Sequence, residues 1–409
     1  MRFVGIDWAQ EEHVVVVIDQ AGVVLGRRSI QHRAADLAAM VAWLDEIAPM
    51  SQGRVVGMES GAGLICEYLL DRAEPVYVFN PKVVDRYRDR FSPAGSKDDH
   101  RDAEVIAGIL RTDRNRFRPF EPDSELTTEM RLRVRGRLRL VERRVALMNE
   151  LGDALRNYYP ATVGLAAHGN DAWFLDFLRR FPDPQAGATA KPAVLARLLR
   201  QHGVRKWTTA RLVEHLRREV MPVRDAIVRG QRANVLALVE QLQVLNAQIA
   251  RADEDIAGLL KLHPDRDLIL SLTGVRTTLA ARMLAEIGDD RARLRDHSTL
   301  QVRAGTAPVT KQSGKGRVQV SMRRSCNRQL QDAFFQQART SRARSSWAQA
   351  FYAQQRRAGR SHATATRNLS NKWAKIVATL LVRREKYDEP RHLRHLEENR
   401  VPWWTQRAA

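Results

Sequence analysis

The sequence has little cysteine, no long apolar run and, over one segment, almost no acid. Its two cysteines, Cys66 and Cys326, are too few and too far apart for a disulfide framework or a zinc cluster. No apolar run approaches the roughly 20 residues that a membrane span requires. The N-terminus also lacks the basic-then-apolar layout of a secretory signal. We therefore expect a cytoplasmic protein with no membrane contact.

The scarcity of acid is concentrated in one part of the chain. Overall there are 68 Lys and Arg against 47 Asp and Glu, a formal net charge of +21. Residues 1–120 hold 16 basic and 18 acidic side chains, whereas residues 301–384 hold 18 basic side chains and one acid, Asp332. Such an excess on a foldable segment usually requires a polyanion, and DNA or RNA is the common one. The alternative, a solvated basic surface, normally mixes both signs.

The first 120 residues alternate between predicted strands and helices. Apolar patterning predicts three short strands within 2–30, a helix at 34–47, a strand at 54–59, a helix after Gly63, a strand at 76–79, and helices near Lys82 and Asp99. A meander followed by alternating helices and strands gives a mixed sheet with helices on its faces. This element order is the one that an α/β RNase H-like domain uses.

Long helices replace the strands after residue 120. Apolar residues spaced alternately by three and four form a heptad seam between Val235 and Leu259, and a rougher seam runs from Met130 to Leu155. A seam this narrow favours a coiled coil over an ordinary buried helix. The two helices can pair as an antiparallel hairpin within one chain or between chains, and oligomerisation is one use of a coiled coil.

Four regions are expected along the chain. They are an RNase H-fold domain at 1–120, coiled-coil helices at 121–262 with an inserted connector at 160–209, a basic and mainly α domain at 263–385, and a tail at 386–409. The basic domain is interrupted by a loop at 305–317 that contains Gly and Pro. The tail contains two prolines and the pair Trp403 and Trp404, and we expect it to be loosely ordered.

Four carboxylates of the first domain stand where metal ligands are expected. Asp7 lies within the apolar first strand and Glu59 ends another, where an unpaired buried carboxylate would be costly. Asp99 and Asp102 are three residues apart at a helix start and share one helical face. Together the four can bind two Mg²⁺ or Mn²⁺ ions, which hold the attacking and leaving oxygens in phosphoryl transfer. Taken singly, Asp99 can be a helix cap and Asp7 can be structural.

A Gly-flanked serine lies in the loop of the basic domain. Ser313 is followed by Gly314 and Gly316, so it can approach a phosphodiester closely. The charge that develops during attack can be neutralised by the basic residues of the same loop, Lys311, Lys315 and Arg317. From the residues alone this is a phosphate-contacting loop, because no His or Asp base lies beside the serine. Ser321 and Ser325 are rival nucleophiles that we rank below Ser313.

An earlier turn of the basic domain can also contact phosphate. The segment 272–276, Leu-Thr-Gly-Val-Arg, leads into an amphipathic helix. Free amides at a helix start suit a phosphate, as in helix-hairpin-helix elements, although an ordinary interhelical turn fits this segment equally well.

These segments resemble the DEDD transposases of the IS110 insertion-sequence family, which begin with a RuvC-like domain of the RNase H fold. The resemblance covers about residues 1–385 and rests mainly on Gly5-Ile6-Asp7-Trp8-Ala9, Met58-Glu59-Ser60, residues 97–103 and the serine loop. It implies metal binding by Asp7, Glu59, Asp99 and Asp102. It also implies that Ser313 is a nucleophile that joins DNA through a phosphoserine, with the metal site of another protomer completing the active centre. Asp98 stands where the family usually has Thr or Ser.

The resemblance further implies a transposase or recombinase that acts as a homo-oligomer, a dimer or tetramer, on DNA at the element ends and target. A structured guide RNA from the element's own noncoding end, the bridge RNA, is implied as a second partner. The expected location is the cytoplasm of a bacterium or archaeon, at the nucleoid when the protein is active. Other expected nucleic-acid contacts are Arg323, Arg324, Arg328, Lys372 and Lys375.

Several alternatives remain open at this point. Trp373 can belong to the core, with Lys372 and Lys375 merely solvated. A metal-dependent nuclease of the Holliday-junction type would use the four acids with water as the nucleophile, and it would form no covalent protein–DNA species. A noncatalytic scaffold would bind nucleic acid tightly and with strong salt dependence, without turnover.

Overall fold

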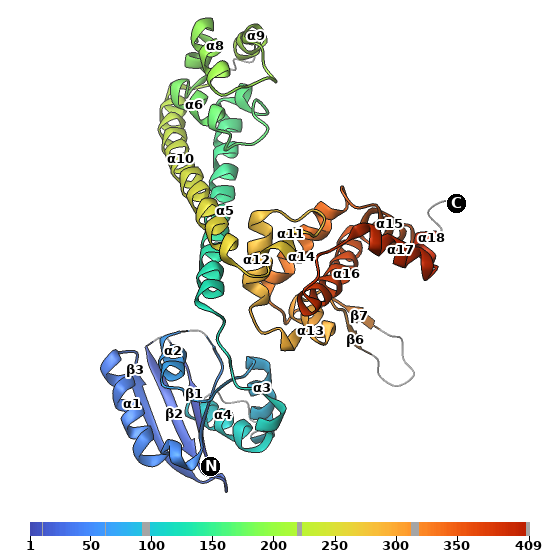
Figure 1. The fold of residues 1–409 in the computed structure, drawn as a ribbon. Helices are drawn as coiled ribbons and strands as arrows, with labels where there is room; N and C mark the ends of the chain where they lie inside the picture. The colour runs from blue at the N-terminus through green and yellow to red at the C-terminus, as the bar shows by residue number, and fades with distance from the viewer. Residues whose placement is uncertain (10, 62, 92–98, 219–222, 312–318, 406–409) are drawn as a thin grey trace. The chain divides into compact units, whose positions relative to one another are not determined.

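The structure is a computed structural model, which describes residues 1–409 except 10, 62, 92–98, 219–222, 312–318 and 406–409. The chain divides into two compact units, residues 1–122 and 123–409, and each is described by itself. The first unit is α/β and the second is almost entirely helical (Figure 1). In the described part of the chain, no helix is both long and apolar enough to cross a membrane.

The first unit is built on a five-stranded mixed sheet with the order β3-β2-β1-β4-β5. Its strands are β1 (Arg2–Asp7), β2 (Glu12–Ile18), β3 (Val24–Gln31), β4 (Arg54–Met58) and β5 (Val76–Val78). The first three strands form an antiparallel meander, and β4 and β5 continue the sheet parallel to β1. The mixed sheet predicted from the sequence is therefore confirmed.

Helices cover both faces of this sheet (Figure 1). α1 (Ala34–Ile47) and α2 (Leu64–Asp71) pack on one face, and α3 (Pro81–Phe91) and α4 (Asp99–Asp113) pack on the other. Alternate residues of β1, β2, β4 and β5 enter the two cores, as the period of a strand requires. The central strands are consequently buried on both sides, which is why their sequences are almost continuously apolar.

The second unit consists of helices and one two-stranded hairpin. Its helices in the described residues are α5 (Glu125–Tyr158), α6 (Ala172–Arg180), α7 (Pro184–Ala188), α8 (Pro192–Gln201), α9 (Thr209–Arg218), α10 (Asp225–Leu262), α11 (Arg266–Leu270), α12 (Thr277–Ile287), α13 (His297–Arg303), α14 (Arg328–Ser341), α15 (Ser346–Arg357), α16 (His362–Arg383), α17 (Glu389–Glu398) and α18 (Pro402–Thr405). The strands β6 (Val309–Lys311) and β7 (Gln319–Ser321) pair antiparallel.

The two long helices α5 and α10 pack along each other within the chain (Figure 1). Arg133 of α5 pairs with Asp255 of α10, and one turn further along α5, Arg137 pairs with Asp253. Residue numbers rise on one helix while they fall on the other, so the pair is antiparallel. Of the two pairings that the heptad seam allows, the structure contains the one within a single chain.

The segment expected as an inserted connector has more structure than its Pro and Gly content indicates. Helices α6, α8 and α9 form a small domain at one end of the α5–α10 hairpin (Figure 1). Its core buries the aromatic rings of Tyr158, Trp173 and Phe177 together with apolar residues of both long helices. The amphipathic segments of the connector thus cover the end of the coiled coil.

The remaining helices of the second unit share a core around α12, α14 and α16. Trp373 of α16 is fully buried there and donates a hydrogen bond from Nε1 to Ser341 Oγ at 2.9 Å. The alternative that Trp373 belongs to the core is therefore confirmed. The strands β6 and β7 are a departure from the sequence expectation of a simple loop, because two three-residue strands are too short to show a period-2 pattern.

The expectation of a loosely ordered tail is wrong for residues 386–405. Helices α17 and α18 pack on the core of the second unit, and Trp404 is 2% exposed. The ring of Trp403 lies edge-on to Phe351, with 5.1 Å between centroids. Pro390 and Pro402 stand in the first turns of these helices, where proline favours a helix start instead of breaking the helix.

Candidate active site

Two of the predicted ligands lie at the carboxyl ends of neighbouring strands. β1 ends at Asp7, and Glu59 directly follows β4. The two strands are parallel, and Ile6 is in register with Met58, so Asp7 and Glu59 occupy the next pair of positions at one edge of the sheet. Both side chains are intermediate in burial. The structure therefore brings these two carboxylates to the same edge.

Gly5 allows α4 to lie directly on β1. A Cβ atom at residue 5 would come within 1.9 Å of the carbonyl oxygen of Ala103 and 2.7 Å of the amide nitrogen of Ala107. No side chain fits between these two backbones, so glycine is required for the approach. The contact fixes Asp102, the residue before Ala103, near the strand that ends in Asp7.

Asp102 is buried and binds an arginine that the sequence analysis did not single out. Arg88 of α3 forms a bidentate ion pair with it, with Nε 2.6 Å from Oδ1 and Nη2 2.7 Å from Oδ2. The Asp102 side chain is only 4% exposed. The hydrogen bonds to Asp102 raise the pKa of Arg88, and the charges of Asp85 and Glu59 act in the same direction. The Arg88 guanidinium therefore lies in the field of at least two of the predicted metal ligands.

The structure describes the remaining predicted site residues only in part. Asp99 begins α4 one turn before Asp102, on the same helical face, and its side chain lies outside the described residues. The same holds for Lys311, whose backbone ends β6. Asp98, Ser313, Lys315 and Arg317 lie wholly outside the described residues. Among the side chains that are described, no three of His, Cys, Asp or Glu are grouped so that they could hold a metal ion.

A buried histidine pair supports the segment that follows Asp7. His13 of β2 is fully buried, and its Nε2 lies 2.8 Å from Nδ1 of His32. The amide of Ala9 donates to Nδ1 of His13 at 3.3 Å, which assigns the ring proton of His13 to Nε2. Burial lowers the pKa of His13, and the neighbouring His32 lowers it further. The hydrogen-bonded histidine pair thus supports the chain beside the carboxylate edge.

The two ends of the serine loop are anchored on the core of the second unit. Gly305 has φ +63°, and a Cβ atom there would lie 2.5 Å from Cys326 Sγ. The amide of Asn327 donates to the carbonyl of Arg303 at 2.8 Å, and its side chain caps α14 through the amide of Leu330. Loop entry and exit are therefore held together at their base, and β6 and β7 continue this pairing outward.

The other predicted nucleic-acid contacts lie on the surface of the same unit. Arg324 and Arg328 are exposed, whereas Arg323 is intermediate and its Nε is buried without a hydrogen-bond partner. Lys372 and Lys375 are exposed on α16, and the Lys372 ammonium lies 5.7 Å from the centre of the Phe351 ring. The rival serines Ser321 and Ser325 are both exposed. These positions are compatible with contact to a polyanion and also with solvation.

Comparisons with known proteins cover both units. Residues 4–160 match a family model for the DEDD transposase of IS110 elements, and residues 266–353 match the model described as "Transposase IS116/IS110/IS902 family". The mini-circle candidate transposase for IS117 of Streptomyces coelicolor is 33% identical over 95% of this chain and 96% of its own length. A candidate transposase of Sinorhizobium fredii is 34% identical over 57% of this chain and 63% of its own length. An IS116 protein of Streptomyces clavuligerus is 26% identical over 93% of this chain and 94% of its own length.

Proposed function

Since the chain belongs to the IS110 family of insertion-sequence transposases, and is a DNA transposase, we propose that it cuts and rejoins DNA through a covalent bond to Ser313. The family membership confirms the resemblance inferred from the sequence, and with it an RNase H-like first domain. The observation that carries the mechanistic proposal is the placement of Asp7 and Glu59 at the carboxyl ends of two neighbouring parallel strands, with the helix that bears Asp102 packed directly on the first of them. The second support is the sequence of the serine loop, which joins the paired strands β6 and β7.

The carboxylate edge is suited to a divalent metal. Domains of this DEDD type depend on divalent metal ions, and carboxylate oxygens are the ligands that Mg²⁺ or Mn²⁺ prefers. Asp7, Glu59, Asp99 and Asp102 would hold the ion, which would stabilise negative charge on phosphate oxygens. The ion pair with Arg88 supports this role, because Asp102 already binds a cationic group of the chain.

The chemistry proposed for the serine balances without an external energy source. Ser313 Oγ attacks the phosphorus of a DNA phosphodiester, an Oγ–P bond forms, and the bond from phosphorus to the leaving deoxyribose oxygen breaks. The serine proton ends on that leaving oxygen, so a free DNA hydroxyl is produced. Attack by another DNA hydroxyl reverses the step and regenerates the serine. Lys311, Lys315 and Arg317 would neutralise the additional negative charge during both attacks.

A guide RNA and an oligomer complete the proposal. The surplus of basic residues in 301–384 exceeds what the single acid of that segment can offset, which supports a second polyanion besides DNA. Exposed apolar side chains on the long helices, among them Leu132, Val145 and Val244, support further contacts of the coiled coil with another copy. A dimer or tetramer would allow the carboxylate edge of one protomer to act with the serine of another.

The covalent step is tested by incubating the protein with guide RNA, Mg²⁺ and end-labelled target DNA. After denaturation, wild type is expected to carry label as a protein–DNA adduct, and Ser313→Ala is expected to carry none. Ser321→Ala and Ser325→Ala are the matched controls, and each is expected to form the adduct. An adduct that persists in Ser313→Ala contradicts the assignment. DNA cleavage by wild type without any adduct would indicate the nuclease that uses water.

A further inference from the structure

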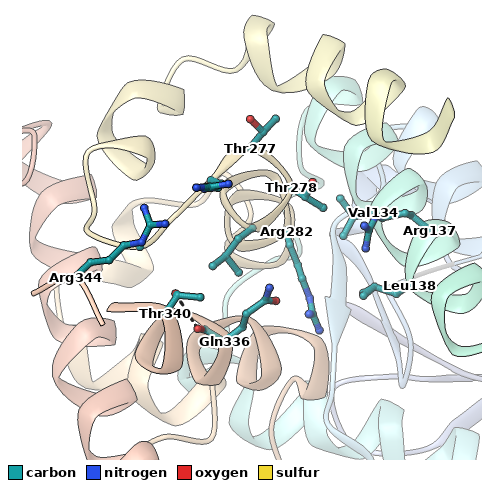
Figure 2. A pocket seen from close by; sticks show the side chains of 12 residues that line it. Val134, Arg137, Leu138, Thr277, Thr278, Arg282, Gln336, Thr340 and Arg344 are labelled. Atoms are coloured by element: carbon teal, nitrogen blue, oxygen red, sulfur yellow. Dashed lines mark hydrogen bonds between the residues drawn. The ribbon is translucent and has the colours of Figure 1, made fainter. Parts of the chain in front are cut away.

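A basic cavity lies between α5, α12 and α14, away from the serine loop in the sequence. Its volume is about 660 Å³. Figure 2 shows Thr277 and Thr278 at the start of α12, with Thr340 and Arg344 on one side and Arg137 on the other. Four arginines and three threonines contribute to the wall, and no acidic residue lines it. All of these residues belong to the second unit.

Two of the four arginines have acidic partners. Arg137 is held by Asp253 of α10, with Nε 2.8 Å from Oδ1, and Arg282 is held by Asp332, with Nη1 2.8 Å from Oδ2. Asp253 also accepts a hydrogen bond from Thr278 Oγ1 at 3.1 Å, which ties α10 to the start of α12. These pairs fix the wall of the cavity and leave its charge balanced at these two positions.

The other two arginines have no such partner. Arg276 immediately precedes α12, and Arg344 follows α14; both are exposed. Within the described part of the chain, neither guanidinium forms a hydrogen bond or an ion pair. The cavity therefore carries a surplus of two positive charges.

Arg282 supplies an independent indication of a missing acceptor. The residue is 5% exposed, and its Nε is buried without a hydrogen-bond partner even though both terminal nitrogens are bonded. Buried N–H groups are rarely left unpaired in folded proteins, and the residue that carries this one contributes to the wall of the cavity. Among ligands, an oxyanion is the acceptor that two surplus guanidinium groups also favour.

The backbone at the start of α12 adds to the same field. The N-cap residue Arg276 makes no side-chain hydrogen bond to the first turn, so the first amides of α12 are uncapped, and the helix dipole places partial positive charge there. Gly274 has φ +85°, and a Cβ atom there would lie 2.8 Å from the amide nitrogen of Ser341. This close contact holds the end of α14, and with it Thr340, against the start of α12.

We propose that this cavity binds a backbone phosphate of the nucleic acid on which the transposase acts. The ligand class is a phosphodiester, held by the uncapped amides of α12 and the guanidinium groups of Arg276 and Arg344, with Arg282 lining the same cavity. The inference rests on the proposed function in one respect, that a nucleic acid occupies this face of the second unit. A phosphate bound here would position the strand without reading its bases.

The turn at 272–276 raised two possibilities, a phosphate site and an ordinary interhelical turn, and the cavity favours the first. The sequence could not decide between them because the arginines come from positions as far apart as 137 and 344. Only the packing of α5, α12 and α14 brings them to one place.

The test compares the double variant Arg276→Ala/Arg344→Ala with a matched control, Arg197→Ala/Arg200→Ala. The control arginines are exposed on α8, outside the cavity, and their removal lowers the net charge equally. Full-length protein carrying Ser313→Ala is used throughout, so that cleavage does not interfere. Binding is measured by fluorescence anisotropy with a labelled 30-base-pair DNA and a labelled 30-nucleotide hairpin RNA over a series of salt concentrations.

The cavity variant is expected to bind about tenfold more weakly. The slope of log K against log salt should also become shallower by about one to two, because fewer counterions are released on binding when phosphate contacts are lost. The control pair is expected to stay within about twofold of the parent. Arg276→Lys/Arg344→Lys is expected to recover most of the affinity. Thermal melting of all variants should be unchanged, since the substituted residues Arg276, Arg344, Arg197 and Arg200 are exposed and have no side-chain partner in the described structure.

The DNA and RNA probes distinguish the possible sources of the phosphate, and the control variants show whether the inference is wrong. A loss with DNA alone assigns the cavity to the DNA backbone, and a loss with RNA alone assigns it to the guide RNA. Equal losses in cavity and control variants, or an unchanged salt slope for both probes, would overturn the inference. Failure of the parent protein to bind either probe would overturn nucleic-acid binding itself and the cavity's role with it, whereas tight binding without an adduct in the serine experiment would leave the cavity standing.

Discussion

The two units of the chain differ in how the charged side chains of their proposed sites are paired. In the first unit, the buried carboxylate of Asp102 is matched by Arg88 from a neighbouring helix of the same unit. In the second unit, Arg276 and Arg344 line a cavity with no described partner for either charge. The first arrangement can exchange one cation for another, whereas the second requires an anion from outside. The comparison supports metal-linked chemistry in the first unit and backbone binding in the second.

The largest expected effect comes from breaking the packing that brings Asp102 to the sheet. Gly5→Ala places a Cβ atom 1.9 Å from a backbone oxygen of α4, which neither strand nor helix can avoid without shifting. We expect the first unit to lose several kcal/mol of stability and metal-dependent activity to disappear. Chemical denaturation followed by hydrogen exchange of each unit measures the loss.

Gly136→Ala is the matched control in the second unit. Apart from the backbone of its own helix, no atom lies within 4 Å of the position its Cβ would take in α5, and alanine is favoured over glycine in a helix by about 1 kcal/mol. This variant is expected to stabilise the coiled coil slightly. If Gly5→Ala were also neutral, the close approach of α4 to β1 would not be what positions Asp102.

The next effect concerns Arg88, the cationic partner of Asp102. Arg88→Ala leaves Asp102 buried without a partner, which typically costs about 3–5 kcal/mol. A divalent ion that uses the same carboxylate should offset part of this cost. We therefore expect added Mn²⁺ to raise the melting temperature of Arg88→Ala more than that of wild type, and calorimetry to show tighter Mn²⁺ binding by the variant.

Arg27→Ala provides the comparison within the same unit. Arg27 pairs with Glu104 at 2.6 Å, but both side chains are about half exposed, so the pair contributes little. Its removal should change neither the stability by more than about 1 kcal/mol nor the Mn²⁺ response. An equal Mn²⁺ response in wild type, Arg27→Ala and Arg88→Ala would show that Arg88 and the metal do not share Asp102.

The first unit was largely predictable from its residues. The helix expected at 34–47 is observed at Ala34–Ile47, and the strands differ from expectation only at their ends. Arg88 could not be predicted, because an arginine among aspartates on an amphipathic helix has the pattern of a solvated surface. Only the packing of α3 against α4 places it at Asp102. The role of Gly5 was likewise invisible before the position of Ala103 was known.

The second unit was harder to predict because its packing depends on distant segments. Both long helices were evident from their apolar seams, but the seams could not decide between pairing within one chain and pairing between chains, because α5 begins about 100 residues before α10. The tail was predicted to be loose because prolines and adjacent tryptophans carry no helical period. In the structure, Trp404 is buried and Trp403 packs on Phe351, so tertiary contacts determine the order of this segment.

The third prediction concerns the apolar packing of the tail on the core of the second unit. Trp404→Ala removes a buried aromatic side chain from the core around α15 and α18, at a typical cost of about 3–5 kcal/mol. Trp403→Ala, at a half-buried position, is expected to cost less. Denaturation of the full chain measures both. A Trp404→Ala protein as stable as wild type would mean that the tail is not part of the folded unit.

The smallest effect concerns Glu286, one of the buried acids that pair with arginine in the second unit. It is fully buried, and its two carboxylate oxygens bind Arg135 at 2.7 and 2.8 Å. The side chain of Asn327 donates a further bond at 2.7 Å. Burial alone would raise the pKa of Glu286, but the hydrogen bonds from Arg135 and Asn327 lower it below its usual value.

A carboxyl group whose pKa is lower in the folded than in the unfolded state contributes stability above its unfolded pKa of about 4.3. That contribution is lost as the pH falls through the folded value. We therefore expect the second unit to lose stability on acidification below about pH 4.3, and Glu286→Gln to lose less over the same range. Glu129→Gln, at the half-exposed pair with Arg133, should follow the wild-type curve. If Glu286→Gln lost stability as steeply as wild type, the acid sensitivity of this unit would have to come from other carboxylates. The buried ion pair of Glu286 would then not be a determinant of the stability of the second unit.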